Sequence, residues 1–290
     1  MWDIFLPYNC TYDERLSNPN CFVHKEIYGL NLVQEWNTYC SKCIHGNKNV
    51  GICVVNRKIK PAFQFSNGFS AQKEYIIQCK KQADVEYIAN FLNPLAEKIY
   101  FYHGEIEDFS FLEKFHYLSH LRISSSRCTH LSWDIHKTPN LSHLSVEGKR
   151  LFDISALANA NKLRNFQFTI ATSRTDRQDI QSLSPLSQLP LLERVEIQGA
   201  RLQDETIDHL ISIPNLKCLF VSPNTYCMDD FAKFEAQKFK IGERYGIYRE
   251  DKEGIFCYGK DVRPWYISRE KEVKIKEYLE KYYTAMEKYK

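Results

Sequence analysis

The sequence predicts an α/β solenoid in which short parallel strands form a sheet on the concave face. One apolar pattern, with apolar residues at its first, fourth and sixth positions, recurs six times. Its copies begin at Ala96, Leu118, Leu141, Leu163, Leu192 and Leu216. Consecutive copies therefore begin 22, 23, 22, 29 and 24 residues apart, and a period of roughly 20 to 29 residues is typical of stacked repeats. Apolar and polar residues alternate at the end of each copy, which indicates a half-buried strand.

Stacking is what makes such repeats stable. A single repeat cannot cover its own apolar face, so each repeat buries that face against its neighbours. The fourth and sixth positions are expected to point into this shared core: Ile99 and Phe101, Leu121 and Ile123, Leu144 and Val146, Phe166 and Phe168, Val195 and Ile197, Leu219 and Val221. Each well-buried side chain of this size contributes roughly 1.5–3 kcal/mol. We therefore expect one continuous core along the repeats.

The second half of each repeat has a pattern of its own. Residues 149–163 read KRLFDISALANANKL, and residues 105–115 and 202–216 have a similar outline. This run resembles the second half of internalin-like short leucine-rich repeats, in which an xIxDIxPLxxLxxL segment follows the strand. The resemblance covers residues 96–225 and implies a leucine-rich repeat solenoid that acts as a binding protein. The family's strand-following asparagine is missing, since Ser126 and Lys149 stand near that position, so we expect a less regular inner hydrogen-bond ladder.

The segments on either side of the repeats predict caps, although length alone allows either one elongated domain or two domains. Residues 1–95 are expected to form a mostly β N-terminal cap that ends in one degenerate repeat, with a strand over 74–79 and a short helix over 84–92, because the first repeat of a solenoid exposes an apolar edge. Residues 96–225 hold the six repeats. Residues 226–290 predict a C-terminal cap made of a helix over 228–237, a β-hairpin around a charged turn at 250–253 and an amphipathic helix after Ser268. The apolar stripe of that helix is expected to pack on the hairpin or on the last repeat: Ile275, Leu279, Tyr282, Met286 and Tyr289.

One interval between repeats is longer than the others. The repeat that begins at Leu163 is extended by about seven residues, and the excess falls within residues 170–179. Insertions within a repeat form loops, often on the binding face. A solvated surface loop and a loop that contacts the partner are equal alternatives here.

Composition and charge narrow the class of protein. The net charge is only +3, from 39 basic and 36 acidic side chains, which argues against a dedicated nucleic-acid binder. No apolar run is long enough to span a membrane, and the first residues lack the basic and apolar regions of an export signal. We therefore expect a cytoplasmic protein whose 10 cysteines are reduced. The abundance of Lys, Asn, Ile and Tyr is compatible with a bacterial origin.

Motifs for metal binding and catalysis are weak. The best metal candidate is the group Cys40, Cys43, His45 and Cys53, because a CxxC pair with further soft ligands can hold structural zinc. A strong zinc signature has a second spaced pair, so we favour free or core thiols and predict no metal and no cofactor. The chain contains no GxSxG elbow, Walker loop, GxGxxG turn or HExxH helix. We therefore expect no enzymatic activity.

The outward positions of the predicted strands form the candidate binding face. His120 and His143 occupy the same position in adjacent repeats, and neighbouring strands lie about 4.8 Å apart, so their rings are expected side by side. A two-histidine metal site or an acid–base pair is conceivable, but Lys98 and Asn165 flank the pair and no carboxylate does, which favours two surface histidines in a recognition face. Tyrosine and arginine are common in interface hot spots. The residues predicted to contact a partner are Tyr100, Tyr102, His120, Arg122, His143, Glu147, Gln167, Arg194 and Glu196.

These observations predict a non-enzymatic protein that binds another protein through its concave face. The specific hypothesis is a bacterial immunity or inhibitor protein that sequesters a toxin or an enzyme. A surface or secreted adhesin of the internalin type is one alternative, and it needs an export signal and a wall anchor. Another alternative is an enzyme, or a substrate-recruiting subunit, whose site lies in residues 1–95 or 240–290.

Overall fold

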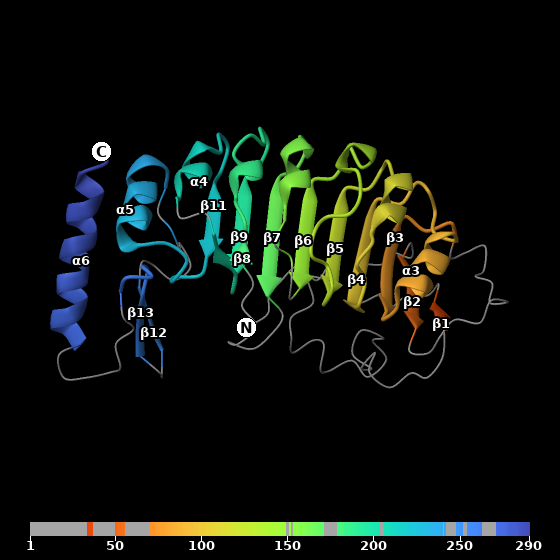
Figure 1. Ribbon diagram of the computed structural model, residues 1–290, viewed down its shortest axis with the longest axis horizontal. Coiled ribbons are helices and arrows are strands. Elements are labelled where there is room, and N and C mark those ends of the chain that lie inside the picture. The colour runs from red at the N-terminus through yellow and green to blue at the C-terminus, as the bar shows by residue number, and fades with distance from the viewer. Residues whose placement is uncertain are drawn as a thin grey trace.

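A nine-stranded sheet runs the length of the array in the computed structural model, in the order β1-β2-β3-β4-β5-β6-β7-β9-β11 (Figure 1). The structure describes residues 34–36, 50–55, 70–148, 151, 153–170, 179–203, 206–239, 241, 248–251, 254–262 and 271–290. The strands are β1 Gln34–Trp36, β2 Val50–Val55, β3 Glu74–Cys79, β4 Lys98–Gly104, β5 His120–Ser125, β6 His143–Gly148, β7 Asn165–Ile170, β9 Arg194–Gln198 and β11 Cys218–Val221. The β1–β2 pair is antiparallel, and every later pair is parallel.

The register of the strands confirms the predicted solenoid. Leu121 pairs with Ile99 on one side and with Leu144 on the other, so equal positions of the repeats lie next to each other. The fourth positions form one unbroken ladder of side chains that are at most 4% exposed: Ile99, Leu121, Leu144, Phe166, Val195 and Leu219. The sixth positions form a parallel ladder and are equally buried. The expected continuous core is therefore present.

Short helices return the chain to the next strand along the array (Figure 1). They are η2 Ser110–Lys114, η3 Ile135–Lys137, η4 Ser155–Asn159, η5 Ser184–Leu186 and α4 Asp208–Ser212. A carboxylate two residues earlier accepts a backbone N–H at the start of the first three, as Asp108 does from Ser110 at 2.8 Å. Each helix also buries one apolar side chain, such as Leu112 or Leu157, against the sheet. The first three short helices thus combine a local carboxylate cap with one buried apolar side chain.

Serines take over part of the role of the missing asparagine ladder. The backbone N–H of Ile106 donates to Ser125 Oγ at 2.9 Å, and the same hydroxyl donates to the carbonyl of Ile106 at 2.7 Å. The backbone N–H of Gly199 donates to Ser222 Oγ at 2.9 Å in the same way. Gly148 allows the backbones to approach closely here, since a Cβ at that position lies 2.8 Å from the carbonyl oxygen of Ser125. The register shifts between Phe101 and Gly104, so the ladder is irregular at that end.

The parallel sheet continues on the N-terminal side of the six predicted repeats. The strand predicted over 74–79 is β3, and the helix predicted over 84–92 is α3, Gln82–Ala89. Strand β3 pairs in parallel with both β2 and β4. The same sheet therefore contains strands on both sides of the predicted boundary between residues 95 and 96. The division into segments 1–95, 96–225 and 226–290 stays a prediction.

The C-terminal segment contains the predicted elements. They are helix α5 (Met228–Gln237), the antiparallel pair β12 (Tyr248–Asp251) and β13 (Gly254–Cys257), and helix α6 (Lys271–Glu287). The buried face of α6 centres on Tyr278, Tyr282 and Ala285, each at most 3% exposed. This face packs mainly on α5, because α5 already covers the end of the array (Figure 1), whereas we predicted packing on the hairpin or the last repeat. The Tyr278 hydroxyl also donates to the carbonyl of Tyr258 at 3.0 Å, beside the hairpin.

Two further strands lie beyond the main sheet. Strand β8 (Asp179–Ile180) pairs in parallel with β10 (Arg201–Leu202). Most of the segment to which the excess length was assigned, residues 171–178, lies outside the described residues. Its predicted alternatives, a solvated loop or a partner-contacting loop, therefore stay open.

Candidate binding face

The outward side chains of the sheet form three rows that cross the strands. The first row contains Glu74, Lys98, His120, His143, Asn165 and Arg194. The second row contains Ile76, Tyr100, Arg122, Ser145, Gln167 and Glu196. The third row contains Gln78 and Tyr102, and after the register shift Ser124, Glu147, Thr169 and Gln198. Parallel register thus places every predicted contact residue on one face.

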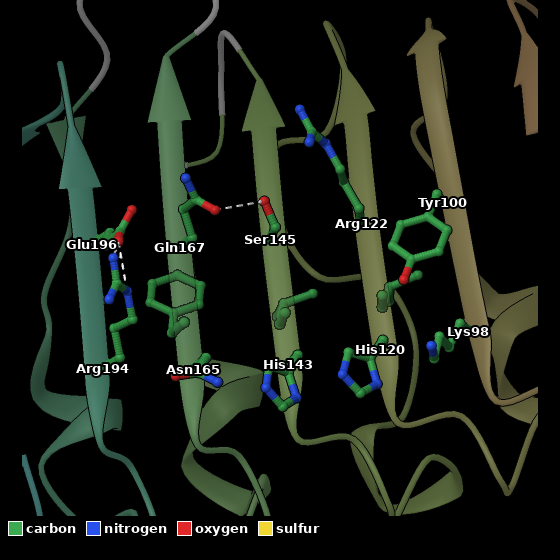
Figure 2. A pocket seen from close by; sticks show the side chains of 13 residues that line it. Lys98, Tyr100, His120, Arg122, His143, Ser145, Asn165, Gln167, Arg194 and Glu196 are labelled. Atoms are coloured by element: carbon green, nitrogen blue, oxygen red, sulfur yellow. Dashed lines mark hydrogen bonds and ion pairs between the residues drawn. The ribbon is translucent and has the colours of Figure 1, made fainter. Parts of the chain in front are cut away.

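A groove of about 220 Å³ lies over the first and second rows (Figure 2). Seven of the nine predicted contact residues line it: Tyr100, His120, Arg122, His143, Gln167, Arg194 and Glu196. Tyr102 and Glu147 do not line the groove, but both contact Arg122. The groove also includes Lys98, Ser145 and Asn165, which were not among the nine. The predicted residues therefore do come together in one place.

The side chains on the floor of the groove are buried, although they occupy outward positions of their strands, which we expected to be exposed. Tyr100 is 8% exposed, Gln167 is 6% exposed and Glu196 is 7% exposed. Neighbouring strands lie only about 4.8 Å apart, so large side chains in one row cover one another. Burial raises the pKa of the Tyr100 hydroxyl, and the Glu74 carboxylate adds to that effect. Ser145 Oγ donates to Gln167 Oε1 at 3.2 Å in the same row.

An ion pair joins the second and third rows. Arg122 Nη2 lies 3.1 Å from Glu147 Oε2, and the two side chains are 12% and 19% exposed. The guanidinium carbon of Arg122 also lies 5.2 Å from the ring centre of Tyr102, within the range of a cation–π contact. Arg122 Nε is buried without a hydrogen-bond partner in the described part of the chain. The arginine is thus held by Glu147 and Tyr102 and still has one unused donor.

The two histidines of the first row are stacked, as expected from their register. Their ring centres lie 4.1 Å apart and their planes differ by 8°. Ser119 Oγ lies 2.9 Å from His120 Nδ1, and Ser142 Oγ lies 2.8 Å from His143 Nδ1. Each serine therefore holds the ring that follows it. Because the ring planes are nearly parallel, their nitrogen lone pairs do not converge on one point, and this geometry favours recognition over a shared metal ion.

Both histidines are neutral near pH 7. Burial lowers the pKa of His120 to about 4, and the neighbouring His143 and Lys98 contribute to the shift. Burial also lowers the pKa of His143, with further contributions from Arg164 and Lys98. Groups that lose their charge on burial add little to the field of the face. Its charges therefore come from lysine, arginine and glutamate side chains.

The predicted zinc candidate is largely outside the described residues. Cys40, Cys43 and His45 are not described, and Cys53 lies in β2, where it pairs with Glu35 and Ile77. Among the described residues, no group of three or more histidine, cysteine, aspartate or glutamate side chains is arranged to hold a metal ion. None of the described helices has the length and hydropathy needed to cross a bilayer. The favoured interpretation, free or core thiols, and the zinc alternative are both untested.

Sequence reasoning missed the contribution of β3 to the face. Glu74, Ile76 and Gln78 begin the three rows, although the repeats were predicted to start at Ala96. A weaker copy of the pattern exists one repeat earlier, with Gln72 at the first position and Tyr75 and Ile77 at the fourth and sixth. It begins 24 residues before Ala96. The polar Gln72 at the first position made this copy hard to recognise, although its 24-residue spacing from Ala96 matches that of the other repeats.

The chain is similar to solved leucine-rich repeat structures. The sequence matches no protein-family model and no curated protein. An internalin C2 from Listeria monocytogenes is 16% identical over 53% of this chain and 73% of that one, with a TM-score of 0.38. A leucine-rich repeat protein from Leptospira interrogans is 13% identical over 61% of this chain and 43% of that one, with a TM-score of 0.48. A complex of TLR13 with a single-stranded RNA gives 10% identity over 55% and 26%, with a TM-score of 0.43. The strand register described above shows the parallel solenoid independently of these similarities.

Proposed function

We propose that this leucine-rich repeat chain binds a folded protein partner through its concave face. The observation that carries the proposal is the groove over the first and second rows, in which aromatic, cationic and amide side chains converge from β4, β5, β6, β7 and β9 (Figure 2). Concave sheets of solenoids offer extended surfaces for contact with a partner. The mixture of side chains is suited to a protein surface, because tyrosine and arginine are enriched among the residues that dominate protein interfaces.

The contacts within the face support the same proposal. Arg122 is held by Glu147 and Tyr102, and His120 and His143 are held by their serines and by each other. Side chains that are already ordered lose less conformational entropy when a partner binds. The face is therefore organised before binding.

Within this proposal, the specific hypothesis is a non-enzymatic bacterial immunity or inhibitor protein of the cytoplasm. Such a protein sequesters a toxin or an enzyme by covering its active surface. The curved three-row face supports this, since it can contact an extended region of a partner. The proposal does not include nucleic acid as a partner, because the net charge is only +3, or a membrane, because no apolar run of the sequence is long enough to span one.

Affinity capture from the source cell tests the proposal. The wild-type chain is compared with Tyr100→Ala/Tyr102→Ala/Arg122→Ala, and we expect one protein to be captured in near-stoichiometric amount by the wild type and lost with the variant. A matched control, Tyr117→Ala/Arg127→Ala/Tyr283→Ala, removes the same residue types from exposed positions outside the three rows. This control is expected to capture the partner unchanged.

Tyr100 is buried, so the triple variant can lose the partner simply because it misfolds. A second variant that keeps Tyr100 separates misfolding from loss of the binding face. Ser145→Arg adds bulk in the groove at a position that is only partly buried, and it removes no core side chain. We expect it to block capture while its unfolding temperature stays close to that of the wild type. Retention of the partner by both the triple variant and Ser145→Arg contradicts binding through this face.

A further inference from the structure

The charged pairs that border the groove are exposed unequally. Lys98 Nζ lies 3.4 Å from Glu74 Oε2, and the side chains are 38% and 10% exposed, respectively. Arg194 pairs with Glu196, and the exposed fractions are 42% for the arginine and 9% for the glutamate. In both pairs the carboxylate is buried in the face and the cation is accessible. A partner at this surface therefore meets the positive member of each pair.

Only nitrogen-bearing side chains stand between these two cations. The first row continues from Lys98 through His120, His143 and Asn165 to Arg194 on successive strands of the sheet. Figure 2 shows these five side chains next to one another along the lower part of the groove. Four steps between strands of about 4.8 Å give this part of the row a length of roughly 19 Å. Ser119 Oγ and Ser142 Oγ donate to the carbonyls of Glu97 and Ser119, so each neutral histidine donates to its serine through Nδ1 and keeps Nε2 as an acceptor. The row thus has a cation at each end, and its two imidazoles donate outward only when they are protonated.

We propose that this part of the first row binds an acidic segment of the partner, with carboxylates opposite Lys98 and Arg194 and, once it is protonated, opposite the histidine pair. The inference rests on the proposed function and names the chemistry that the partner must offer. Carboxylates accept hydrogen bonds from ammonium, guanidinium and imidazolium groups, and these bonds are strong because the donors are charged. An extended chain rises about 3.3 Å per residue. Acidic side chains at alternate positions therefore recur about every 6.6 Å, and roughly four of them span the row from Lys98 to Arg194.

A bound carboxylate also changes the protonation of the histidines. Burial and the charges of Lys98 and Arg164 lower the pKa of His143, and a carboxylate opposite the pair acts in the reverse direction. The other charged groups around the pair are the ion pairs of Glu74 with Lys98, Arg122 with Glu147 and Arg194 with Glu196. The complex therefore binds more protons than the free chain. Its affinity is expected to rise as the pH falls from about 7.5 to about 5.5, where carboxylates stay ionised.

Protein carboxylates fit this row better than a phosphate backbone does. Nucleic-acid sites depend on many unpaired cations, which release counterions from the phosphates. The part of the first row from Lys98 to Arg194 holds two cations, Lys98 and Arg194, which is enough for a few carboxylates and too few for a phosphate backbone. A short oligouridine is therefore a useful competing probe, expected to bind more weakly than an acidic peptide.

The experiment measures binding of defined peptides to the full chain by fluorescence anisotropy at low salt. One peptide alternates glutamate and serine over about twelve residues, which exceeds the estimated length of the row, and a second alternates lysine and serine. We expect the glutamate peptide to bind and the lysine peptide not to bind. Binding of the glutamate peptide is expected to weaken with added salt, because salt screens exposed charges.

Three variants connect that binding to the row. Lys98→Met/Glu74→Gln removes both charges of a pair, so no buried charge is left without a partner, and it is expected to weaken binding of the glutamate peptide about threefold to fivefold. Glu74→Gln alone is expected to strengthen binding, because it leaves Lys98 unneutralised. Lys276→Met on α6 removes a cation that is 79% exposed and far from the groove along the array, and it is expected to change nothing.

Several results overturn the inference. Equal binding of the two peptides, tighter binding of oligouridine, or affinity that decreases as the pH falls from about 7.5 to about 5.5 contradicts it. The capture experiment separates this failure from failure of the proposed function. If a captured partner is lost with Ser145→Arg but retained by Lys98→Met/Glu74→Gln, and the glutamate peptide does not bind, the proposed function stands and the acidic segment is excluded. If no partner is captured at all, the proposed function fails whichever peptide binds.

Discussion

The two faces of the sheet are stabilised by different interactions. Phe166 and Gln167 are neighbours on β7, and both are nearly buried, at 0% and 6% exposed. Phe166 lies in the apolar ladder between Leu144 and Val195, where any apolar side chain of similar volume satisfies its surroundings. Gln167 lies on the concave face and accepts a hydrogen bond from Ser145. Burial of apolar side chains stabilises the inner face of the sheet, whereas hydrogen bonds and ion pairs between particular side chains order the outer face.

The largest expected effect tests the inner side. Phe166→Ala removes a fully buried ring from the ladder, and such a substitution costs about 3–5 kcal/mol in the free energy of unfolding because it also leaves a cavity. Gln167→Ala, one residue away, is expected to cost clearly less, since it removes one hydrogen bond of about 1 kcal/mol. Urea unfolding of both variants measures the difference. Equal losses would show that the two sides of the strand contribute alike.

A smaller effect tests the pairing on the outer side. Arg122→Ala leaves Glu147 largely buried without its cation, and we expect a loss of about 1–3 kcal/mol. Glu147→Ala likewise leaves Arg122 largely buried without its carboxylate partner. The double variant is expected to lose less than the sum of the two single losses, because neither charge is then stranded. Additive losses in this double-mutant cycle would mean that the two side chains do not interact.

The smallest effect concerns the pH dependence of stability. The folded-state pKa of His120 is about 4, below the ordinary value of about 6.5, and the pKa of His143 is also lowered. Between these two pH values the unfolded chain binds more protons than the folded chain, so the stability falls as the pH falls. His120→Gln/His143→Gln is therefore expected to lose less stability than the wild type between pH about 7 and about 5. If the urea midpoints of the wild type and of the double variant change identically with pH, groups other than these two histidines cause the loss of stability.

Much of the architecture was predictable because it depends on local, periodic features. The spacing of Leu118, Leu141 and Leu163 predicted the register in which Leu121 lies beside Leu144. The same register predicted that His120 and His143 stand side by side. A strand over 74–79 was predicted, but its place in the register of the repeats was not, because Gln72 puts a polar residue at the first position of that copy. The position of α6 was only partly predicted, since its stripe indicated an apolar contact and α5 proved to be the surface that it packs on.

The sequence by itself determined which side chains point inward and which lie in one row, because a strand alternates its faces and parallel repeats keep their register. Only the tertiary structure decided how the outer side chains pair. Arg122 and Glu147 are 25 residues apart, and nothing local requires their contact or the burial of Glu74 beneath Lys98. Such contacts depend on the distances between strands and on the volume that each neighbour leaves free. Those quantities exist only once the repeats have stacked.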